Sequence, residues 1–380
     1  MASMQNLLDF SFDELVAFFH ELNEPTSGAQ ELWKDLYRRF ETDFDVMTNL
    51  SPLLKEKLSQ SARLSTLEAI EEVTSDDSLT SKALFRLSDG KTVESTLMFF
   101  RNAGSGRGRR TVCVSSQVGC PIGCQFCATG QQGFERNLSS GEIIAQVLYF
   151  IRRLEQEVMP VGGKQSHNPL TNVVFMGMGE PLANYENVRR AISILNSPKG
   201  LNMGVRQITL STVGLLPEML QLSRENIQCQ LALSLHAPND SLRQRLVPIA
   251  RKYALEELVS ACDEYSRATN QHIYIEYALF KGVNDSLEIA DELIGLLNGH
   301  AFHVNLIPCN QTAIGGFTPS VDENAIAFQK RLINGGIRTM LRLSRGSDIE
   351  AGCGQLKSRW LTEYHVPRDD KSSDSDTVSR

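Results

Sequence analysis

The sequence predicts an α/β protein whose larger part is a partial (βα) barrel, and three observations support this prediction. From about Thr111 onward, short apolar β-rich runs alternate with amphipathic helical stretches, as in parallel βα units. About six or seven such units indicate a partial or full barrel rather than a Rossmann sheet. Polar and glycine-rich residues follow the runs, at the strand ends where barrel enzymes have their active sites. The runs are TVCVSS, NVVFMGMGE, RQITLSTVG, CQLALSLHA, HIYIEYALF, FHVNLIP and IRTMLRLSRG.

The N-terminal part, residues 1–75, is predicted to be a small helical accessory domain. Ser11 and Glu14 form a capping box in front of an apolar stretch with helical spacing. Ser51 and Pro52 open a further helix, with the proline in its first turn.

Three further segments complete the expected organisation. Residues 76–110 read as a β-hairpin around Asp89-Gly90, a strong turn signal, followed by a basic linker. Residues 111–365 form the barrel domain. The tail, 366–380, is polar and charged and is expected to be disordered.

The composition is that of a soluble globular protein, with 41% hydrophobic and 22% charged residues. The sequence contains no run of about 18 apolar residues, so no membrane span is expected. The N-terminus does not resemble a signal peptide. We therefore expect a cytoplasmic protein with reduced cysteines. The net charge of −7 argues against a general nucleic-acid binder but leaves room for a local basic face.

Three of the 8 cysteines lie close together, in the spacing Cys-x3-Cys-x2-Cys at Cys120, Cys124 and Cys127. A structural zinc site or a fully ligated iron–sulfur cluster takes about four protein ligands. Three thiolates on a four-iron cluster leave one iron open to a small molecule. This spacing is the signature of radical S-adenosylmethionine (SAM) enzymes, with an incidental zinc or structural cluster site as the alternative.

A glycine-rich turn, GMGEPL at Gly177–Leu182, follows the strand-like run NVVFM. Glycines allow the backbone to approach a bound molecule closely. We expect this turn to lie against the methionine part of SAM, although many such turns are only tight connections.

With the cysteines placed, the chain resembles the RlmN/Cfr family of radical SAM methyltransferases, which methylate adenosine in RNA. The resemblance covers about Val93 to Leu356, and the helical N-terminal segment is similar to the family's accessory domain. The matching motifs are CVSSQVGC, CQFCATGQQGFERNL, FMGMGEPLAN, LSTVG, SLHAPND, YALFKGVND, HVNLIP and SRGSDIEAGCGQL.

The resemblance implies a route to adenine carbon 2, which is too electron-poor to attack a sulfonium methyl group directly. Cys353 would first be methylated, and an adenosyl radical would then take a hydrogen from its S-methyl group so that the carbon adds to adenine. Glu94 would act as the general base at carbon 2. Cys113 would attack the sulfur of Cys353, form a disulfide and release methylated RNA.

The resemblance also implies the cofactors and partners. One [4Fe-4S] cluster on the cysteine triplet and two molecules of SAM per turnover are expected, with an electron donor such as flavodoxin and a monomeric enzyme. The positions that match the family's SAM contacts are Gly179, Glu180, Ser211, Ser234, Leu235, His236 and Asn310.

The expected substrates are 23S rRNA, in the peptidyl-transferase region, and tRNA, at the adenosine 3′ to the anticodon. GEPL and TGQQGF are typical of the carbon-2 branch, RlmN, whereas the carbon-8 branch linked to antibiotic resistance, Cfr, typically has GEAL. Carbon-8 methylation therefore stays the alternative. Two other hypotheses are an RNA-binding protein with a structural metal and a radical enzyme with another substrate.

Basic clusters are candidate contacts for the RNA phosphates, with a solvated charged surface as the plainer interpretation. They are the Arg101–Arg110 loop, Arg243 with Arg245, Arg251 with Lys252, and Arg342 with Arg345.

Overall fold

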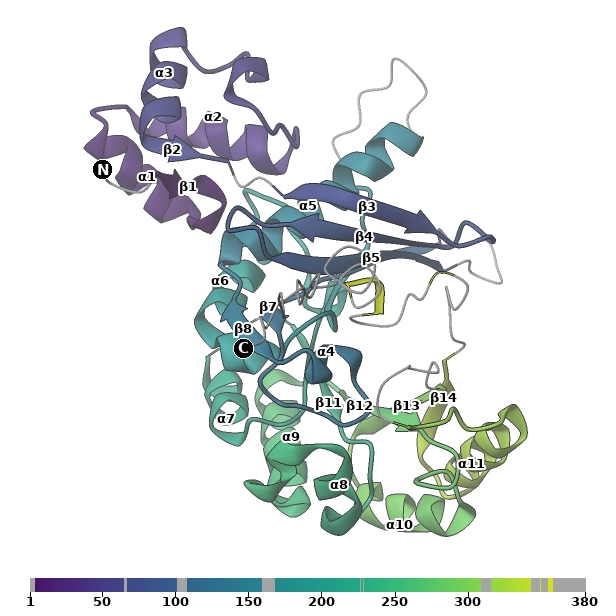
Figure 1. The fold of residues 1–380 in the computed structure, drawn as a ribbon. Helices are drawn as coiled ribbons and strands as arrows, with labels where there is room; N and C mark the ends of the chain where they lie inside the picture. The colour runs from purple at the N-terminus through teal and green to yellow at the C-terminus, as the bar shows by residue number, and fades with distance from the viewer. Residues whose placement is uncertain are drawn as a thin grey trace, which may run out of the picture.

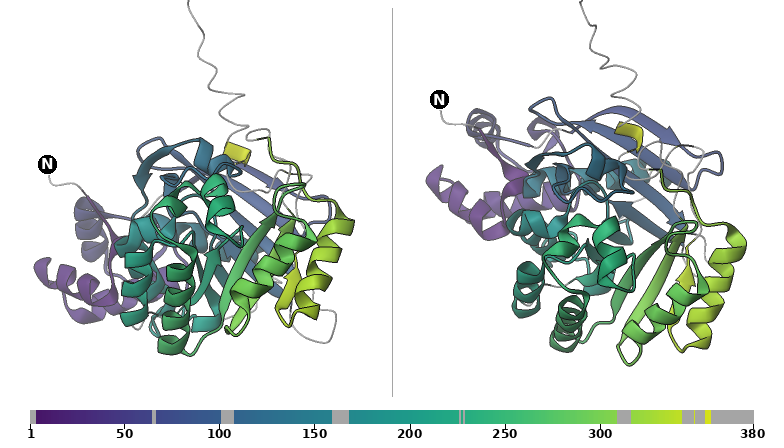
Figure 2. Two further views of the ribbon diagram at one scale, coloured as in Figure 1. Left: turned by 90° about the horizontal axis from the view of Figure 1, so that it is seen from below. Right: turned by 60° about the horizontal axis from the view of Figure 1, so that its bottom comes forward.

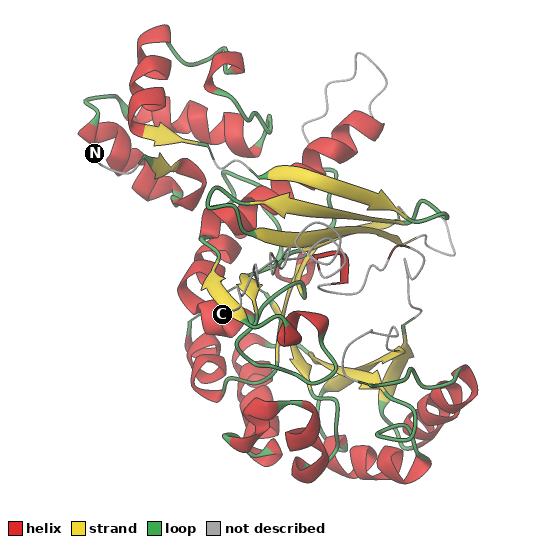
Figure 3. Ribbon diagram, viewed as in Figure 1, coloured by secondary structure: helices red, strands yellow, loops and turns green. Residues whose placement is uncertain are grey.

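A ten-stranded sheet with helices on its outer side dominates the protein (Figures 1 and 3). The structure is a computed structural model, and of the 380 residues it describes 4–64, 67–100, 108–158, 168–225, 227, 229–308, 316–342, 349 and 355–357. Among the described residues, no helix is long and apolar enough to cross a membrane.

The elements have the following bounds. The strands are β1 (Gln5–Asn6), β2 (Ala62–Arg63), β3 (Glu68–Thr74), β4 (Thr80–Arg86), β5 (Thr92–Phe100), β6 (Arg109–Cys113), β7 (Gln117–Gly119), β8 (Phe134–Asn137), β9 (Asn172–Phe175), β10 (Ile208–Thr212), β11 (Gln230–Ser234), β12 (Ile273–Leu279), β13 (Phe302–Pro308) and β14 (Arg338–Leu341). The α-helices are α1 (Phe12–Glu21), α2 (Thr26–Tyr37), α3 (Pro52–Ser61), α4 (Ala128–Gln131), α5 (Ser140–Val158), α6 (Tyr185–Asn196), α7 (Leu216–Arg224), α8 (Asp240–Leu246), α9 (Leu255–Thr269), α10 (Leu287–Leu297) and α11 (Asp322–Asn334). The 3-10 turns are η1 (Leu7–Asp9), η2 (Phe44–Val46), η3 (Pro181–Asn184), η4 (Val205–Gln207) and η5 (Pro248–Arg251).

The strand order of the large sheet is β14-β13-β12-β11-β10-β9-β6-β5-β4-β3. All neighbours from β6 to β14 run parallel, and β3 to β6 pair antiparallel. In the described part of the chain the two edge strands, β14 and β3, do not pair, so the sheet curves without closing (Figure 2). The predicted partial barrel is confirmed, and each of the seven predicted runs contains one of the strands β6 and β9–β14.

The helical N-terminal segment begins as the sequence predicts. Ser11 and Glu14 form a reciprocal capping box at α1, and the Ser51 hydroxyl caps α3, which has Pro52 in its first turn. This segment packs against the start of α5, where the backbone amide of Gly141 donates a hydrogen bond of 2.6 Å to the Asp9 carboxylate.

One strand in the N-terminal region differs from the helical expectation. Glu68–Thr74 forms β3, the outer strand of the β3–β4–β5 meander. Its sequence, EAIEEVT, is rich in glutamate, which favours helices in isolation, but pairing with β4 decides the structure at this charged sheet edge.

The predicted hairpin is present, with a three-residue loop of residues 88–90 between Leu87 and Lys91, whose backbone groups are hydrogen-bonded at 2.8 Å. Gly90 has a φ of +83°, a left-handed conformation that glycine adopts without steric cost. The loop fixes the pairing of β4 with β5, so that Lys82 lies opposite Thr96. The predicted basic linker lies mostly outside the described residues, as do the boundary at 365 and the tail 366–380.

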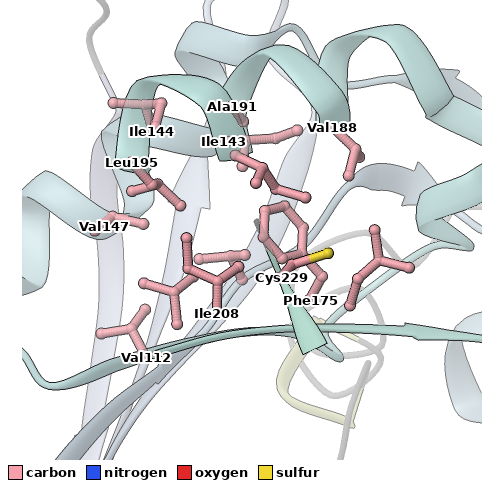
Figure 4. Close-up of a cluster of buried hydrophobic side chains, with 14 of the residues drawn as sticks. Val112, Ile143, Ile144, Val147, Phe175, Val188, Ala191, Leu195, Ile208 and Cys229 are labelled. Carbon is pink, nitrogen blue, oxygen red and sulfur yellow. The ribbon is translucent and has the colours of Figure 1, made fainter. Parts of the chain in front are cut away.

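The main core lies between the parallel strands and helices α5 and α6 (Figure 4). Helix α5 begins at a capping box in which Ser139 and Glu142 exchange hydrogen bonds. The apolar side chains that meet in this layer are Val112, Ile143, Ile144, Val147, Phe175, Val188, Ala191, Leu195 and Ile208, together with Cys229.

Because side chains alternate along a strand, residues next to these core positions face the other side of the sheet, the barrel interior. Cys113 follows the core residue Val112 on β6, and Ser211 follows Leu210 on β10. Register then places Ser234, Glu276 and Asn305 side by side on β11, β12 and β13. The sheet thus carries a row of polar groups inside the barrel.

Candidate active site

The cysteine triplet lies on the loop between β7 and α4, at the end of the parallel sheet where the strands finish. The backbone amide of Cys120 donates to the Gly133 carbonyl at 2.8 Å, and that of Cys127 donates to the Cys124 carbonyl at 3.1 Å. Gly119, with a φ of +76°, has no room for a side chain, because a Cβ there would lie 1.9 Å from the Gly133 oxygen. These contacts give the loop a defined shape.

The loop packs against the ends of β11 and β12. Phe126 lies edge-on to the His236 ring, with ring centres 4.9 Å apart, and contacts Phe280 at 5.0 Å. The amide of Gln125 donates to the Leu246 carbonyl on α8 at 3.1 Å. The cysteines are therefore held beside the predicted SAM positions on β11.

The thiols of the triplet have an environment suited to an iron–sulfur cluster. Burial raises the pKa of Cys120 to about 12 and also raises the pKa values of Cys124 and Cys127. Backbone amides of Ile122 and Gly123 face the Cys120 sulfur, and those of Thr129 and Gly130 face the Cys127 sulfur. A metal that binds here must displace the thiol protons, and the amides would then stabilise the thiolates.

The same residues do not form a site for one metal ion. Within the described ranges, no group of three or more His, Cys, Asp or Glu side chains is placed to hold a single ion. A four-iron cluster accepts each thiolate at a different iron, so its ligands need not converge on one point. The donor set of three soft thiolates thus fits a cluster with one iron free.

Gly179 and Glu180 lie on the turn after β9, next to the cysteine loop. Gly179 has a φ of +104°, and a Cβ there would lie 2.6 Å from the Gln117 side chain. The Glu180 carboxylate accepts hydrogen bonds from the backbone amides of Leu182 at 3.0 Å and Val213 at 2.9 Å. Burial raises the pKa of Glu180 to about 7. Its carboxyl group therefore ties the β9 turn to the β10 turn.

The predicted SAM positions on β10 and β11 meet in the barrel interior. The hydroxyl groups of Ser211 and Ser234 are 3.2 Å apart. Leu235 is buried and bonds through its backbone amide to the Glu276 carbonyl. His236 is buried with a φ of +61°, and its Nδ1 accepts a hydrogen bond from the Ala278 amide at 3.0 Å. Burial, with a contribution from Arg243, lowers the pKa of His236 to about 3, so the imidazole is neutral.

Glu94 and Cys113 lie on adjacent strands of the same sheet, on the face that lines the interior. Glu94 forms an ion pair of 2.5 Å with Lys82, and the two side chains are only 3% and 1% exposed. Lys82, Thr96 and Cys113 are successive cross-strand neighbours on β4, β5 and β6. Burial raises the pKa of the Cys113 thiol to about 11, and the Lys82 and Glu94 charges also act on it.

Cys353 and Asn310 lie outside the described residues, but the chain just after Cys353 is described. Residues 355–357 form a short helical turn beside β5 (Figures 1 and 2). Leu356 is buried there, and the backbone amide of Lys357 donates a hydrogen bond to Glu94 Oε1. The described cysteines are all free thiols, so no disulfide forms among them.

Three buried charges in this region were missed by the sequence reasoning. Lys82 and Glu276 stand inside the apolar runs SKALF and IYIEYALF, and a charge within a strand was an available signal. Glu276 accepts from Asn305 at 2.8 Å and pairs with Arg342 at 3.3 Å. Arg243 was grouped with possible RNA contacts, but it is fully buried on α8 and cannot reach RNA at the surface.

Comparison with protein families gives two matches along the chain. Residues 114–293 match the model of the radical SAM superfamily, and residues 5–64 match the ribosomal RNA large subunit methyltransferase N-terminal domain.

Named relatives match over almost their whole length. The chain is 40% identical over 358 residues to "Probable dual-specificity RNA methyltransferase RlmN" of Clostridium novyi, covering 94% of this chain and 99% of that protein. It is 40% identical over 360 residues to "Ribosomal RNA large subunit methyltransferase N" of Nitrosopumilus maritimus, covering 94% and 99%. The crystal structure of a radical SAM methyltransferase from Sphaerobacter thermophilus matches with a TM-score of 0.86 and 43% identity, over 92% of this chain and 98% of that one.

Proposed function

Because the chain belongs to the RlmN family of radical SAM RNA methyltransferases, we propose that it methylates carbon 2 of adenosine in 23S rRNA and of the adenosine 3′ to the anticodon in tRNA. The observation that carries this proposal is the match, at about 40% identity and over 94% of the chain, to a relative named as a dual-specificity RNA methyltransferase. The named relatives favour the RlmN interpretation over the Cfr alternative.

The family implies a [4Fe-4S] cluster and SAM. Cys120, Cys124 and Cys127 would hold the cluster, and Gly179, Glu180, Ser211, Ser234, Leu235, His236 and Asn310 would surround SAM. When bound, these cofactors supply the methyl group and the adenosyl radical, and we propose two molecules of SAM per turnover. The imidazole of His236 is neutral and adds no charge to this part of the site. At Gly179 the backbone packs closely on Gln117 and leaves no room for a side chain.

Cys353 and Cys113 are the proposed covalent residues. Cys353 would carry the methyl carbon as a thioether and deliver it to adenine. The Cys113 thiolate would then attack the Cys353 sulfur, so that a sulfur–sulfur bond forms while the sulfur–carbon bond breaks. The electron pair of the broken bond would stay with the carbon, which takes up a proton and becomes the methyl group of the RNA. The interior position of Cys113, and the contact of Lys357 with the neighbouring strand, support this pairing.

Glu94 is the proposed general base that removes the proton from carbon 2. Its side chain is buried and forms an ion pair with Lys82, which holds the carboxylate in place on β5. The hydrogen bond between Ser115 Oγ and the Glu94 carbonyl, at 2.6 Å, fixes β5 beside the chain that leads into the cysteine loop. Glu94, the proposed base, and Cys113, the proposed attacking thiol, therefore lie on two paired strands of the same sheet.

The remaining partners belong to the same proposal. The enzyme would act as a cytoplasmic monomer on RNA and would receive electrons from a donor such as flavodoxin. The target adenosine must leave its stack to reach the barrel interior.

The experiment is anaerobic reconstitution of the cluster, followed by incubation with SAM, a reductant and unmodified 23S rRNA or tRNA fragments. Mass analysis of the digested nucleosides should give 2-methyladenosine from both RNAs. A product of 8-methyladenosine would overturn the carbon-2 assignment, and no methylation of tRNA would remove the second substrate. Replacing Cys120, Cys124 and Cys127 by alanine should abolish both the iron content and the product.

A further inference from the structure

We propose that Arg243 is a positioning residue whose buried guanidinium supplies a permanent positive charge beside Cys124 and thereby raises the reduction potential of the cluster. This inference rests on the proposed function, since it requires the cysteine loop to hold an iron–sulfur cluster.

Arg243 is anchored at the ends of the two central strands. Its guanidinium donates to the backbone carbonyls of Val213 at 2.5 Å, Leu235 at 3.2 Å and Ser234 at 3.5 Å. These carbonyls follow or end β10 and β11, where the predicted SAM contacts lie. The side chain thus connects the two strand ends from within the protein.

No carboxylate contacts the guanidinium of Arg243 among the described residues, although the charge of Asp240, on the same helix, also acts on it. The arginine side chain is fully buried, and in the described part of the structure no carboxylate forms a salt bridge with it. Its Nη1 atom is buried and has no hydrogen-bond partner there. A buried unpaired cation is costly, and such a group is expected to face an anion that belongs to the site.

The cysteine loop is the neighbour that would bring this anion. Leu242 and Leu246 flank Arg243 on α8 and pack in one apolar cluster with Ile122 and Cys124. The Gln125 amide bonds to the Leu246 carbonyl at 3.1 Å, which fixes the loop on this helix. The Cys124 sulfur acts on the charge of Arg243 more strongly than Asp240 or Cys262 does. A cluster bound through Cys124 would therefore lie close to the guanidinium.

The consequence is electrostatic. Reduction adds an electron to the cluster, so a nearby fixed positive charge stabilises the reduced form more than the oxidised form. Net charge, hydrogen bonds and solvent exposure are the factors that set cluster potentials. Arg243 would make the cluster easier to reduce, which is the step that the enzyme needs before SAM can be cleaved.

The test is the reduction potential of the reconstituted full-length protein without SAM, measured by a redox titration followed by electron paramagnetic resonance. Arg243→Met and Arg243→Gln remove the charge and should shift the potential to more negative values. Arg243→Lys keeps the charge and should stay closer to the unsubstituted protein. Arg245→Met is the matched control, because Arg245 is exposed on the same helix and solvent screens its charge.

Each outcome decides the proposal. Equal reduction potentials for the Met variant, the Gln variant and the unsubstituted protein would overturn the proposal. This holds even if the two variants bind SAM more weakly. If the neutral variants fold by circular dichroism but hold no iron while Arg243→Lys does, the requirement for a cation at this place is supported. If the lysine variant also fails to hold iron, Arg243 is purely structural and the proposal is wrong. Cluster spectra and RNA methylation of the unsubstituted protein test the proposed function separately.

Discussion

Glu94 accepts a hydrogen bond from the backbone amide of Lys357, which ties the chain that follows Cys353 to the strand that carries the proposed base. Lys357 comes four residues after Cys353. The other oxygen of Glu94 pairs with Lys82. One buried carboxylate thus links the hairpin with the segment next to the proposed methyl carrier. Its hydrogen bond to the Lys357 amide would have to weaken for Glu94 to take a proton through Oε1.

The buried pair of Lys82 and Glu94 should be strongly coupled in stability. We expect Lys82→Met or Glu94→Gln alone to lower the free energy of unfolding by about 3–5 kcal/mol, because each leaves a buried charge without its oppositely charged neighbour. The double variant should lose less than the sum of the two. Denaturant titration of the metal-free protein measures these changes.

The neighbouring pair of Arg86 and Glu68 is the matched control, since it joins β4 to β3 at 3.1 Å with side chains 44% and 64% exposed. Its removal should cost about 1 kcal/mol or less. If removing the exposed pair lowers the free energy of unfolding as much as removing the buried pair, then burial is not what makes the Lys82–Glu94 pair important.

Gly179→Ala should be much more disruptive than Gly282→Ala, although both glycines have a positive φ. At Gly282 nothing lies within 4 Å of the added Cβ, so only backbone strain of about 1–2 kcal/mol is expected. At Gly179 the clash with Gln117 adds about 1–3 kcal/mol. Thermal unfolding compares the two, and SAM binding by the reconstituted protein should fall for Gly179→Ala alone. Equal losses of stability for the two variants would mean that the turn at Gly179 rearranges to accommodate the added methyl group.

His236 should make the metal-free protein sensitive to acid. Its pKa is about 3 in the folded protein, against about 6.5 when unfolded. A lowered folded pKa contributes stability above pH of about 6.5, and this contribution is lost by about 1.4 kcal/mol per pH unit as the pH falls toward 3. His236→Asn tolerates the left-handed backbone and should flatten this slope.

The control for that measurement is His272→Asn, because His272 is exposed at the surface. Unfolding titrations between pH 7 and pH 4 compare the slopes of His236→Asn, His272→Asn and the unsubstituted protein. An unchanged slope in His236→Asn would mean that His236 is not the buried neutral group described above.

Cys113→Ala should stop the reaction after the carbon has joined the adenine. Without the second thiol, the sulfur–carbon bond has no attacking group, so RNA should stay covalently attached to the protein and appear on a denaturing gel. Cys262→Ala, in the core, should give free methylated RNA instead. In the unsubstituted protein, release should speed up as the pH rises toward the Cys113 pKa of about 11. Free product from Cys113→Ala would remove this residue from the proposed chemistry.

The parallel strands could be predicted from the sequence because each is an apolar run between helical stretches, and their ends locate the site. The contacts that depend on register could not. A two-residue turn at Asp89-Gly90 would place Lys82 and Glu94 on opposite faces, since a shift of one residue exchanges the faces of a strand. The three-residue loop puts both on the same face.

The sequence also could not show which face of α8 points into the protein. Arg243 and Arg245 look alike in SLRQRL, yet the first is buried and the second exposed. The packing of Leu242 and Leu246 on the cysteine loop turns Arg243, and not Arg245, toward the backbone carbonyls inside the protein. Propensity likewise failed for the glutamate-rich strand β3, where pairing at the sheet edge outweighs the local preference.

The central claim is that Cys353 carries the methyl carbon to RNA, and transfer of an isotope label tests it most directly. The reconstituted enzyme is given SAM with a deuterated methyl group, freed of the excess, and then supplied with unlabelled SAM, reductant and RNA. The account predicts label on the Cys353 peptide before RNA is added and, afterwards, two of the methyl deuteriums in 2-methyladenosine. Methylated RNA from Cys353→Ala, or product without label from the preloaded enzyme, would contradict it.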